Sequence, residues 1–256
     1  MTAPADLADP PLSTERYGRS IEVVGETGST NDDARAAAER GVPDGHVVVA
    51  DRQVAGRGAH GRPWDSPGGS DLYLSIVARV PLEPARLPPL TLAVGLGVAR
   101  ALEAVVPAAR VEQKWPNDVL MDGRKVSGVL VETVSSGTRV QSAILGIGVN
   151  VNRARFAPAL EAHATSLRLA SGARHDRARV LAGLLACVER QVDAFVRMGP
   201  RAVLGGVEAR LAWRDRRVRC GDVEGVLAGL RDDGALRVRG DDGVEHALVA
   251  GTLRRA

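Results

Sequence analysis

The order of apolar and polar positions along the first two hundred residues predicts short strands interleaved with helices. Apolar runs bounded by turn-forming residues predict strands at residues 21–25, 46–50, 72–78 and 111–115. Apolar positions at three- and four-residue spacing predict helices at residues 87–105 and 176–197. Another helix is expected between the N-cap residues Ser29, Thr30 and Asn31 and the terminating Gly41. The segment from Gln53 to Asp71 is a Gly/Pro-rich loop.

Two turns further along the chain predict the type of sheet. Asp122-Gly123 is typical of a hairpin turn, and Ser135-Ser-Gly137 predicts a second turn with strands on both sides. Hairpins join antiparallel strands. The sheet is therefore expected to be mixed or mostly antiparallel, which gives an α/β (α+β) fold class.

The pattern changes at both ends of the chain. From residue 209 to residue 256 it predicts only short strands, separated by the turns Asp232-Asp-Gly234 and Asp241-Asp-Gly243. This texture indicates a small barrel-like β domain. Residues 1–13 are rich in Pro, Ala and Asp, so a disordered leader is expected there. Residues 14–208 then form the main domain.

Composition excludes several classes of protein. The 256 residues are 45% hydrophobic but only 3% aromatic, so the core must be built from Ala, Val and Leu. The net charge of +3 comes without a basic stripe or tail, so no nucleic acid partner is expected. The start lacks a signal peptide, and no charge-free apolar stretch approaches the length of a membrane span. Cys187 and Cys220 lack metal-ligand spacing, which indicates reduced thiols in a cytoplasmic protein.

Lysine is rare in this chain and confined to one segment. Of 34 Lys and Arg residues only Lys114 and Lys125 are lysine. An ammonium is a compact point charge that fits beside a carboxylate or phosphate, whereas a guanidinium is a broad planar fork. The two lysines are therefore candidates for chemistry, although chance in an arginine-biased composition explains the count equally well.

A glycine-rich loop follows the second predicted strand. Gly56-Arg-Gly-Ala-His-Gly61 matches the dinucleotide-binding pattern G-x-G-x-x-G, but the following Arg62-Pro-Trp-Asp-Ser-Pro does not open a helix. What remains is a flexible loop with Arg57, His60 and Arg62 beside Trp64. Its glycines allow close approach to an anion and its arginines can bind phosphate. An ordinary surface loop is the alternative.

Polar residues also follow the predicted strand that ends at Trp115. Asn117 and Asp118 offer an amide and a carboxylate, and carboxylate and phosphate oxygens are the ligands that Mg²⁺ prefers. Asn150 ends the apolar run 144–149. Each of these asparagines is either a turn residue or a polar anchor, so each signal is weak by itself.

Together the motifs resemble one family, the biotin protein ligases, in the family's order and over residues 20–256. The segments that carry the resemblance are Gly28-Ser-Thr-Asn31, Gln53-Val-Ala-Gly-Arg-Gly-Ala-His-Gly-Arg-Pro-Trp64, Lys114-Trp-Pro-Asn-Asp118, Gly123-Arg-Lys-Val-Ser-Gly128 and Gly146-Ile-Gly-Val-Asn-Val-Asn152. The resemblance implies a fold related to class II aminoacyl-tRNA synthetases, followed by an SH3-like barrel. The chain also resembles the form of the family that ligates without an N-terminal DNA-binding domain.

The resemblance implies an enzyme, a biotin-[acetyl-CoA-carboxylase] ligase. It activates biotin with ATP and Mg²⁺ as biotinyl-5′-AMP and transfers biotin to a lysine of a biotin carboxyl carrier domain. The residues implied to bind biotin are Ser29, Thr30, Asn31, Gln53, Arg57, Gly58, Ala59 and Lys125. Those implied to bind ATP are Arg62, Trp64, Asn117 and Asn150, and the catalytic residues are Arg57, Lys114, Asp118 and Lys125, with Asp118 as metal ligand.

Two rival functions and one departure from the family pattern remain. A lipoate or other acyl-carrier ligase shares the related fold, and a dinucleotide-dependent oxidoreductase would use Gly56–Gly61 as its fingerprint. The family's loop commonly reads Gly-Arg-Gly-Arg, whereas the second arginine is Ala59 here. The sequence leaves the oligomeric state open, with a homodimer among the options.

Overall fold

The computed structural model describes residues 4–80, 87–136 and 139–256. The first part of the chain contains β1 (Ile21–Thr27), α1 (Thr30–Glu39), β2 (His46–Gln53), β3 (Leu72–Ala78), α2 (Leu87–Val105), β4 (Val111–Lys114), β5 (Asp118–Met121), β6 (Arg124–Ser136) and β7 (Arg139–Val149). The second part contains α3 (Pro158–Glu161), α4 (Leu167–Ser171), α5 (Arg177–Met198), α6 (Arg201–Glu208), β8 (Arg217–Cys220), β9 (Val223–Leu230), β10 (Leu236–Arg239), β11 (Glu245–Leu248) and β12 (Leu253–Arg255). Short 3₁₀ turns lie at Ala5–Leu7 and Ala59–Gly61.

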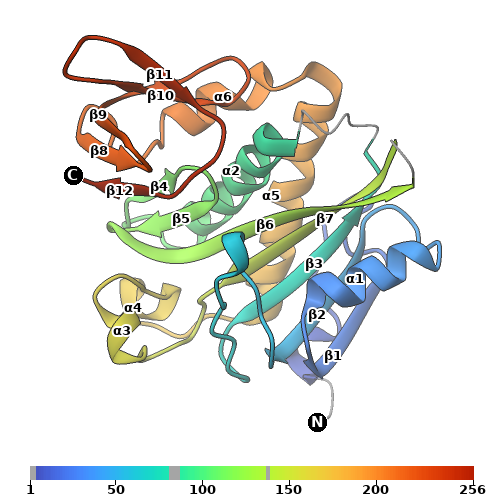
Figure 1. Cartoon of the computed structure of the whole chain (residues 1–256). Coiled ribbons are helices and arrows are strands. Elements are labelled where there is room, and N and C mark those ends of the chain that lie inside the picture. The colour runs from blue at the N-terminus through green and yellow to red at the C-terminus, as the bar shows by residue number, and fades with distance from the viewer. Residues whose placement is uncertain (1–3, 81–86, 137–138) are drawn as a thin grey trace.

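A seven-stranded sheet in the order β1-β2-β3-β7-β6-β5-β4 forms the centre of the molecule (Figure 1). β1 and β2 are parallel and the other neighbours are antiparallel, so the predicted mixed sheet is confirmed. The β5–β6 turn falls on Asp122 and Gly123, whose φ angles of 50° and 77° are those of a tight hairpin. At the second predicted turn, Gly137 lies outside the described residues, and β6 and β7 pair up to Ser136 and Arg139.

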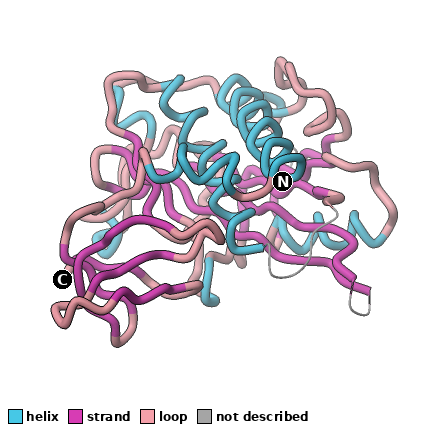
Figure 2. The backbone as a smooth tube through the Cα atoms, turned by 90° about the horizontal axis from the view of Figure 1, so that it is seen from above, coloured by secondary structure: helices cyan, strands magenta, loops and turns pink. Residues whose placement is uncertain are grey.

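Helices cover both faces of this sheet. α1 packs on Val48, Val77 and Ile144, while α2 and α5 pack together on the opposite face and enclose the larger core (Figure 2). Among the described residues, α2 has one window, Pro88–Val105, that is long and apolar enough to cross a membrane. Because 67% of that window is buried inside the fold, we interpret α2 as a core helix.

The N-terminal segment differs from its expected disorder. In residues 4–13, Leu7 is fully buried in the core, and the guanidinium of Arg177 donates to both carboxylate oxygens of Asp6 at 2.8 Å. The prediction of disorder is therefore wrong for these residues. One apolar side chain and one ion pair hold a segment whose composition alone predicted no fixed structure. Residues 1–3 lie outside the described part.

The C-terminal strands form a separate antiparallel sheet in the order β11-β10-β9-β8-β12, as expected for a small β domain. Just before this sheet begins, residues 210–212 run beside β4 of the main sheet. The amide of Gln113 donates to the carbonyl of Arg210 at 2.8 Å, and the amide of Ala212 donates to the carbonyl of Gln113 at 2.9 Å. The mixed α/β fold class is confirmed. The boundary between residues 208 and 209 stays a prediction.

Candidate active site

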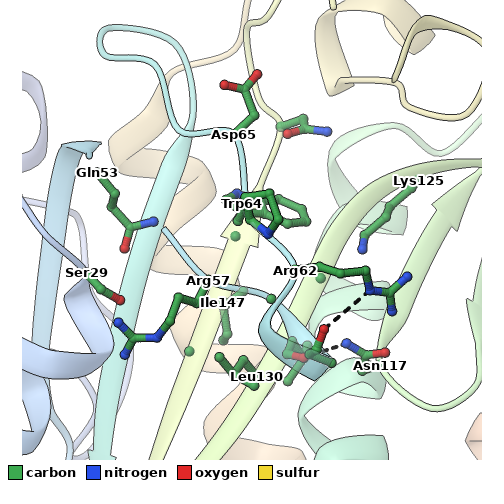
Figure 3. Close-up of a pocket in the computed structure, with 18 of the residues that line it drawn as sticks. Ser29, Gln53, Arg57, Arg62, Trp64, Asp65, Asn117, Lys125, Leu130 and Ile147 are labelled. Atoms are coloured by element: carbon green, nitrogen blue, oxygen red, sulfur yellow. Dashed lines mark hydrogen bonds between the residues drawn. The ribbon is translucent and has the colours of Figure 1, made fainter. Parts of the chain in front are cut away.

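A cavity of about 250 Å³ opens on the sheet between the glycine loop, β6, β7 and the segment that follows β7 (Figure 3). The predicted site residues that line it are Ser29, Thr30, Asn31, Gln53, Arg57, Gly58, Ala59, Arg62, Trp64, Asn117, Lys125 and Asn150. Lys114 and Asp118 do not line this cavity, but Asp118 contacts Lys125 beside it. The structure thus brings together segments that are far apart in the sequence.

One end of the cavity is polar and buried. The side-chain oxygen of Gln53 accepts from the amide of Thr30 at 2.9 Å and lies 3.2 Å from its hydroxyl. The hydroxyl of Ser75 lies 2.6 Å from Oδ1 of Asn31, which is 4% exposed. Ser29 caps α1 without a hydrogen bond from its own side chain, so its hydroxyl is available to a ligand. This end presents both donors and acceptors in fixed positions.

The glycine loop folds back on itself as a small hairpin. The amide of Gly58 donates to the carbonyl of Arg62 at 2.7 Å, and the amide of Trp64 donates to the carbonyl of Gly56 at 2.8 Å. No helix follows Gly61 in this described segment, since Arg57 and Pro63 pair as an isolated bridge. The pyrophosphate-binding helix N-terminus that a dinucleotide fingerprint needs is therefore absent from the loop.

Arg57 is tied to the start of α1. Its guanidinium forms a two-pronged ion pair with Asp32 at 2.5 and 2.7 Å. The hydrogen bond from Arg57 lowers the pKa of the Asp32 carboxyl, and the same bond raises the pKa of Arg57. Ala59 lines the cavity two residues further on and adds no charge there.

Trp64 lies flat against glycines of the sheet. Gly128 of β6 and Gly148 of β7 are paired neighbours, and a Cβ on Gly148 would approach the indole to 2.5 Å. A Cβ on Gly146 would likewise overlap the side chain of Asn31. Each glycine therefore leaves space for a side chain of the cavity wall. The glycine spacing of this motif is thus a consequence of close packing.

The two lysines face one carboxylate. Nζ of Lys125 lies 2.6 Å from Oδ1 of Asp118, and Nζ of Lys114 lies 3.7 Å from Oδ2. The Lys125 ammonium also lies 5.0 Å from the centre of the Trp64 ring. Burial lowers the pKa of Lys114, partly offset by Asp118. Asp118 therefore fixes both ammonium groups at the edge of the cavity.

The two predicted asparagines also hold backbone. Nδ2 of Asn117 donates to the carbonyl of Val129 at 3.0 Å, and Nδ2 of Asn150 donates to the carbonyl of Thr165 at 2.9 Å. Asn150 is 4% exposed, so it is a polar anchor at the end of β7. Arg62 is exposed by contrast, with Nε 3.4 Å from the carbonyl of Ala59.

The far wall of the cavity was not predicted from the sequence. Asp65, Arg153, Phe156, Leu160 and Ala164 line it as well. Asp65 adjoins Trp64 in the quoted motif, and Arg153 directly follows Asn152, so proximity to motifs was the available signal. Phe156, Leu160 and Ala164 lie in a segment without a motif, and only the fold brings them to the cavity.

The described residues contain no group of three His, Cys, Asp or Glu side chains that could hold a metal ion. Both oxygens of Asp118 face ammonium groups, so a cation there would compete with two lysines. The arrangement does not fit a metal held by protein side chains alone. The assignment of Asp118 as a metal ligand stays a prediction.

Known proteins that resemble this chain belong to one family. Residues 26–150 match the model of the biotin/lipoate A/B protein ligase family. The chain is 34% identical to the bifunctional ligase/repressor BirA of Bacillus spizizenii, over 92% of this chain and 76% of that protein. It is 35% identical to the biotin–[acetyl-CoA-carboxylase] ligase of Mycobacterium tuberculosis, over 85% of this chain and 82% of that protein.

The chain belongs to the biotin protein ligase family. A solved structure agrees, the biotin protein ligase of Aquifex aeolicus in complex with biotin and ATP, which is 31% identical with a TM-score of 0.82 over 93% of this chain and all of that one. The family resemblance found in the motifs is thereby confirmed. The Mycobacterium tuberculosis and Aquifex aeolicus proteins are biotin ligases, so they do not favour the lipoate ligase or the oxidoreductase.

Proposed function

We propose that the protein is an ATP-dependent biotin–[acetyl-CoA-carboxylase] ligase. The observation that carries the proposal is the single cavity that joins a polar end at Asn31 and Gln53 to a cationic end at Lys125. Apolar side chains of the sheet, Leu74 and Ile147 among them, lie between these ends. A ligand with a polar ring, an apolar body and a carboxylate matches this order of surfaces.

In the first step a carboxylate oxygen of biotin attacks the α-phosphorus of ATP, and pyrophosphate leaves. Both reactants are negative, so the step depends on cationic groups that are fixed before the reaction. Lys125 is oriented by Asp118 toward the carboxylate end, and Arg62 is exposed at the same mouth. Arg57 reaches the anion by exchanging its ion pair with Asp32.

In the second step the amine of a carrier-domain lysine attacks the acyl carbon, and AMP leaves. Trp64 shields the acyl phosphate from water on the glycine-loop side, and Phe156 and Leu160 cover the nucleotide on the other side. Shielding matters because water competes with the lysine for the same carbon. The acceptor in this proposal is a biotin carboxyl carrier domain.

Magnesium enters the proposal with ATP. Mg²⁺ keeps several waters and binds chiefly to nucleotide phosphates, so it does not need a protein cage. When bound it offsets phosphate charge. We also propose a cytoplasmic location, which agrees with two buried free cysteines in the described part of the chain. Nucleic acid is not part of the proposal.

The test is acid-dependent exchange of labelled pyrophosphate into ATP. The purified protein with Mg²⁺ is compared with biotin, with lipoate and with neither acid. We expect exchange with biotin only, because the polar end of the cavity is built for a ring with several donors and acceptors. Exchange driven by lipoate would replace the proposal with the rival ligase, and no exchange with either acid would reject both.

A further inference from the structure

Arg153 joins three parts of the cavity wall that come from different segments. It is the first residue after the Asn152 motif, and its side chain is 7% exposed. Its guanidinium pairs with Asp71 at the start of β3 and with Asp65 in the glycine-loop segment. The guanidinium carbon of Arg153, Cζ, also lies 5.0 Å from the centre of the Phe156 ring. One side chain thus contacts the residue before β3, the glycine-loop segment and the segment that follows β7.

The contact with the sheet is the fixed one. Nε of Arg153 donates to Oδ2 of Asp71 at 2.7 Å, and Asp71 is fully buried. Oδ1 of Asp71 accepts from the amide of Val151 at 2.9 Å, while the hydroxyl of Tyr73 lies 3.2 Å from Oδ2. The orientation of the guanidinium is therefore set before any ligand binds.

The contact with the glycine loop is the one that depends on Arg153. Nη1 donates to the carboxylate of Asp65 at 2.6 Å, and Nη2 donates to the carbonyl of the same residue at 2.9 Å. The Asp65 side chain is 55% exposed, so the burial that holds Asp71 is missing here. Asp65 directly follows Trp64, and Figure 3 shows both on the same stretch of chain above the cavity.

We propose that Arg153 is a positioning residue for two stretches of the cavity wall, the glycine-loop segment at Trp64 and Asp65 and the chain at Phe156. By holding both over the cavity it retains the acyl-adenylate. The inference rests on the proposed function and extends it to a residue outside the predicted site. A guanidinium is needed because its planar fork bonds Asp71 and both groups of Asp65 simultaneously. An ammonium at the end of a flexible stem cannot hold that geometry.

Arg177 supplies a matched control. Its side chain is also 7% exposed and also pairs with two carboxylates, Asp6 and Asp51. None of these residues lines the cavity. Arg177 also donates from Nη1 to the carbonyl of Asp71 at 3.2 Å, so the two arginines share the backbone of Asp71 but not its carboxylate. Arg177→Lys therefore reports what the loss of a buried guanidinium costs at this end of β3, whereas only Arg153→Lys removes the contacts with Asp65 and Phe156.

The experiment compares wild type, Arg153→Lys, Asp65→Asn, the double variant and Arg177→Lys. Labelled biotinyl-AMP is formed in a single turnover without carrier domain, and its release is timed. We expect Arg153→Lys and Asp65→Asn each to speed release about ten- to a hundredfold, as for one lost charge-assisted hydrogen bond. The double variant should release no faster than Arg153→Lys, because Arg153→Lys already removes the ion pair that Asp65→Asn removes. Arg177→Lys should release at the wild-type rate.

A second readout does not depend on catalysis. Hydrogen exchange in the unliganded protein reports the amides of Gly58 and Trp64, which close the loop hairpin. Arg153→Lys and Asp65→Asn should speed exchange at these amides and leave those of β3 unchanged. Asp65→Asn alters an exposed carboxylate, so it carries the test even where Arg153→Lys fails to fold.

Three outcomes would overturn the inference. Wild-type release and wild-type loop exchange in Asp65→Asn would show that the Arg153–Asp65 ion pair does not hold the loop. Equal acceleration by Arg177→Lys would show a general loosening, and multiplicative effects in the double variant would show two independent roles. A wild-type protein that forms no adenylate rejects the proposed function instead, and loop exchange then still decides whether Arg153 holds the loop.

Discussion

At the scale of single residues, the site is organised by carboxylates that orient cations before a ligand arrives. Asp118 faces Lys125 and Lys114, and Asp32 holds Arg57. Pairing with Asp118 fixes the two ammonium groups, and preorganised charge is more effective than charge that must reorient during reaction. Arg57 differs, because it must leave Asp32 before it can reach the anion. The same pairing also explains why a wider or displaced cation should fail at these positions.

Lys125→Arg keeps the charge but widens the group. The ammonium lies between Asp118 at 2.6 Å and the Trp64 ring at 5.0 Å, so a guanidinium must push one of them away. We expect biotin affinity to fall about tenfold, which is about 1.4 kcal/mol. Titration calorimetry with biotin measures it. Arg124→Lys, on the same hairpin but exposed, is the control and should bind normally; unchanged affinity in Lys125→Arg would mark Lys125 as surface charge.

Ala59 is the residue at which this chain departs from the family's common loop. Ala59→Arg returns a cation to a loop that lines the cavity, so it should hold the anionic intermediate more firmly. We expect release of biotinyl-AMP to slow about ten- to a hundredfold, as for one added charge-assisted hydrogen bond. Single-turnover release without carrier domain measures it, with Ala59→Leu as an uncharged control. Equal release from Ala59→Arg and wild type would show that position 59 does not retain the adenylate.

Sequence could identify the residues that carry chemistry but not the residues that position them. Lys125 and Trp64 stand in the motifs that carry the family resemblance, and both line the cavity. Arg153 acts through Asp65 and Phe156, and such a link depends on which segments the fold brings together. The buried Leu7 is a similar case, because its partners come from distant parts of the chain.

At the scale of elements, local patterns determined what could be predicted. Turn chemistry predicts the hairpin at Asp122-Gly123, and apolar spacing predicts the helices α2 and α5. The structure contains all of them. How closely two helices approach is not a local property. Gly97 of α2 lies against α5, where a Cβ would come within 2.6 Å of the Cα of Val188.

This contact predicts opposite effects for two glycine-to-alanine changes in the helix pair. Gly97→Ala forces the helices apart and should destabilise the fold by about 1–3 kcal/mol. Gly183→Ala lies on the exposed side of α5 with nothing within 4 Å of its Cβ, so it should stabilise by about 0.5–1 kcal/mol. Urea unfolding measures both. A neutral Gly97→Ala would show that the α2–α5 spacing adjusts freely.

At the scale of the whole molecule, the C-terminal sheet lies beside β4 and β5 at the edge of the main sheet (Figure 1). β4 ends at Lys114. The indole of Trp115 donates to the carbonyl of Gly234 at 3.3 Å. Trp213 lies between two cations, with Nζ of Lys114 at 5.2 Å from its ring and the guanidinium carbon of Arg255 at 5.3 Å. The turn that leads into the C-terminal sheet therefore helps to hold a predicted catalytic lysine.

Trp213→Leu should therefore weaken ATP use without changing biotin binding. The family resemblance places Lys114 toward the nucleotide or the catalytic centre. Loss of the ring removes a cation–π contact of about 0.5–2 kcal/mol from the partly buried Lys114, so we expect KM for ATP to rise several-fold. Trp213→Phe keeps an aromatic face and should lie between the Leu variant and wild type. Biotin affinity should stay unchanged in both, because the polar end of the cavity at Asn31 and Gln53 is built from other elements. Pyrophosphate exchange at varied ATP gives KM, and calorimetry gives the biotin affinity. If KM for ATP in Trp213→Leu equals that of wild type, Lys114 is held by Asp118 alone, and the two sheets share a boundary without sharing a function.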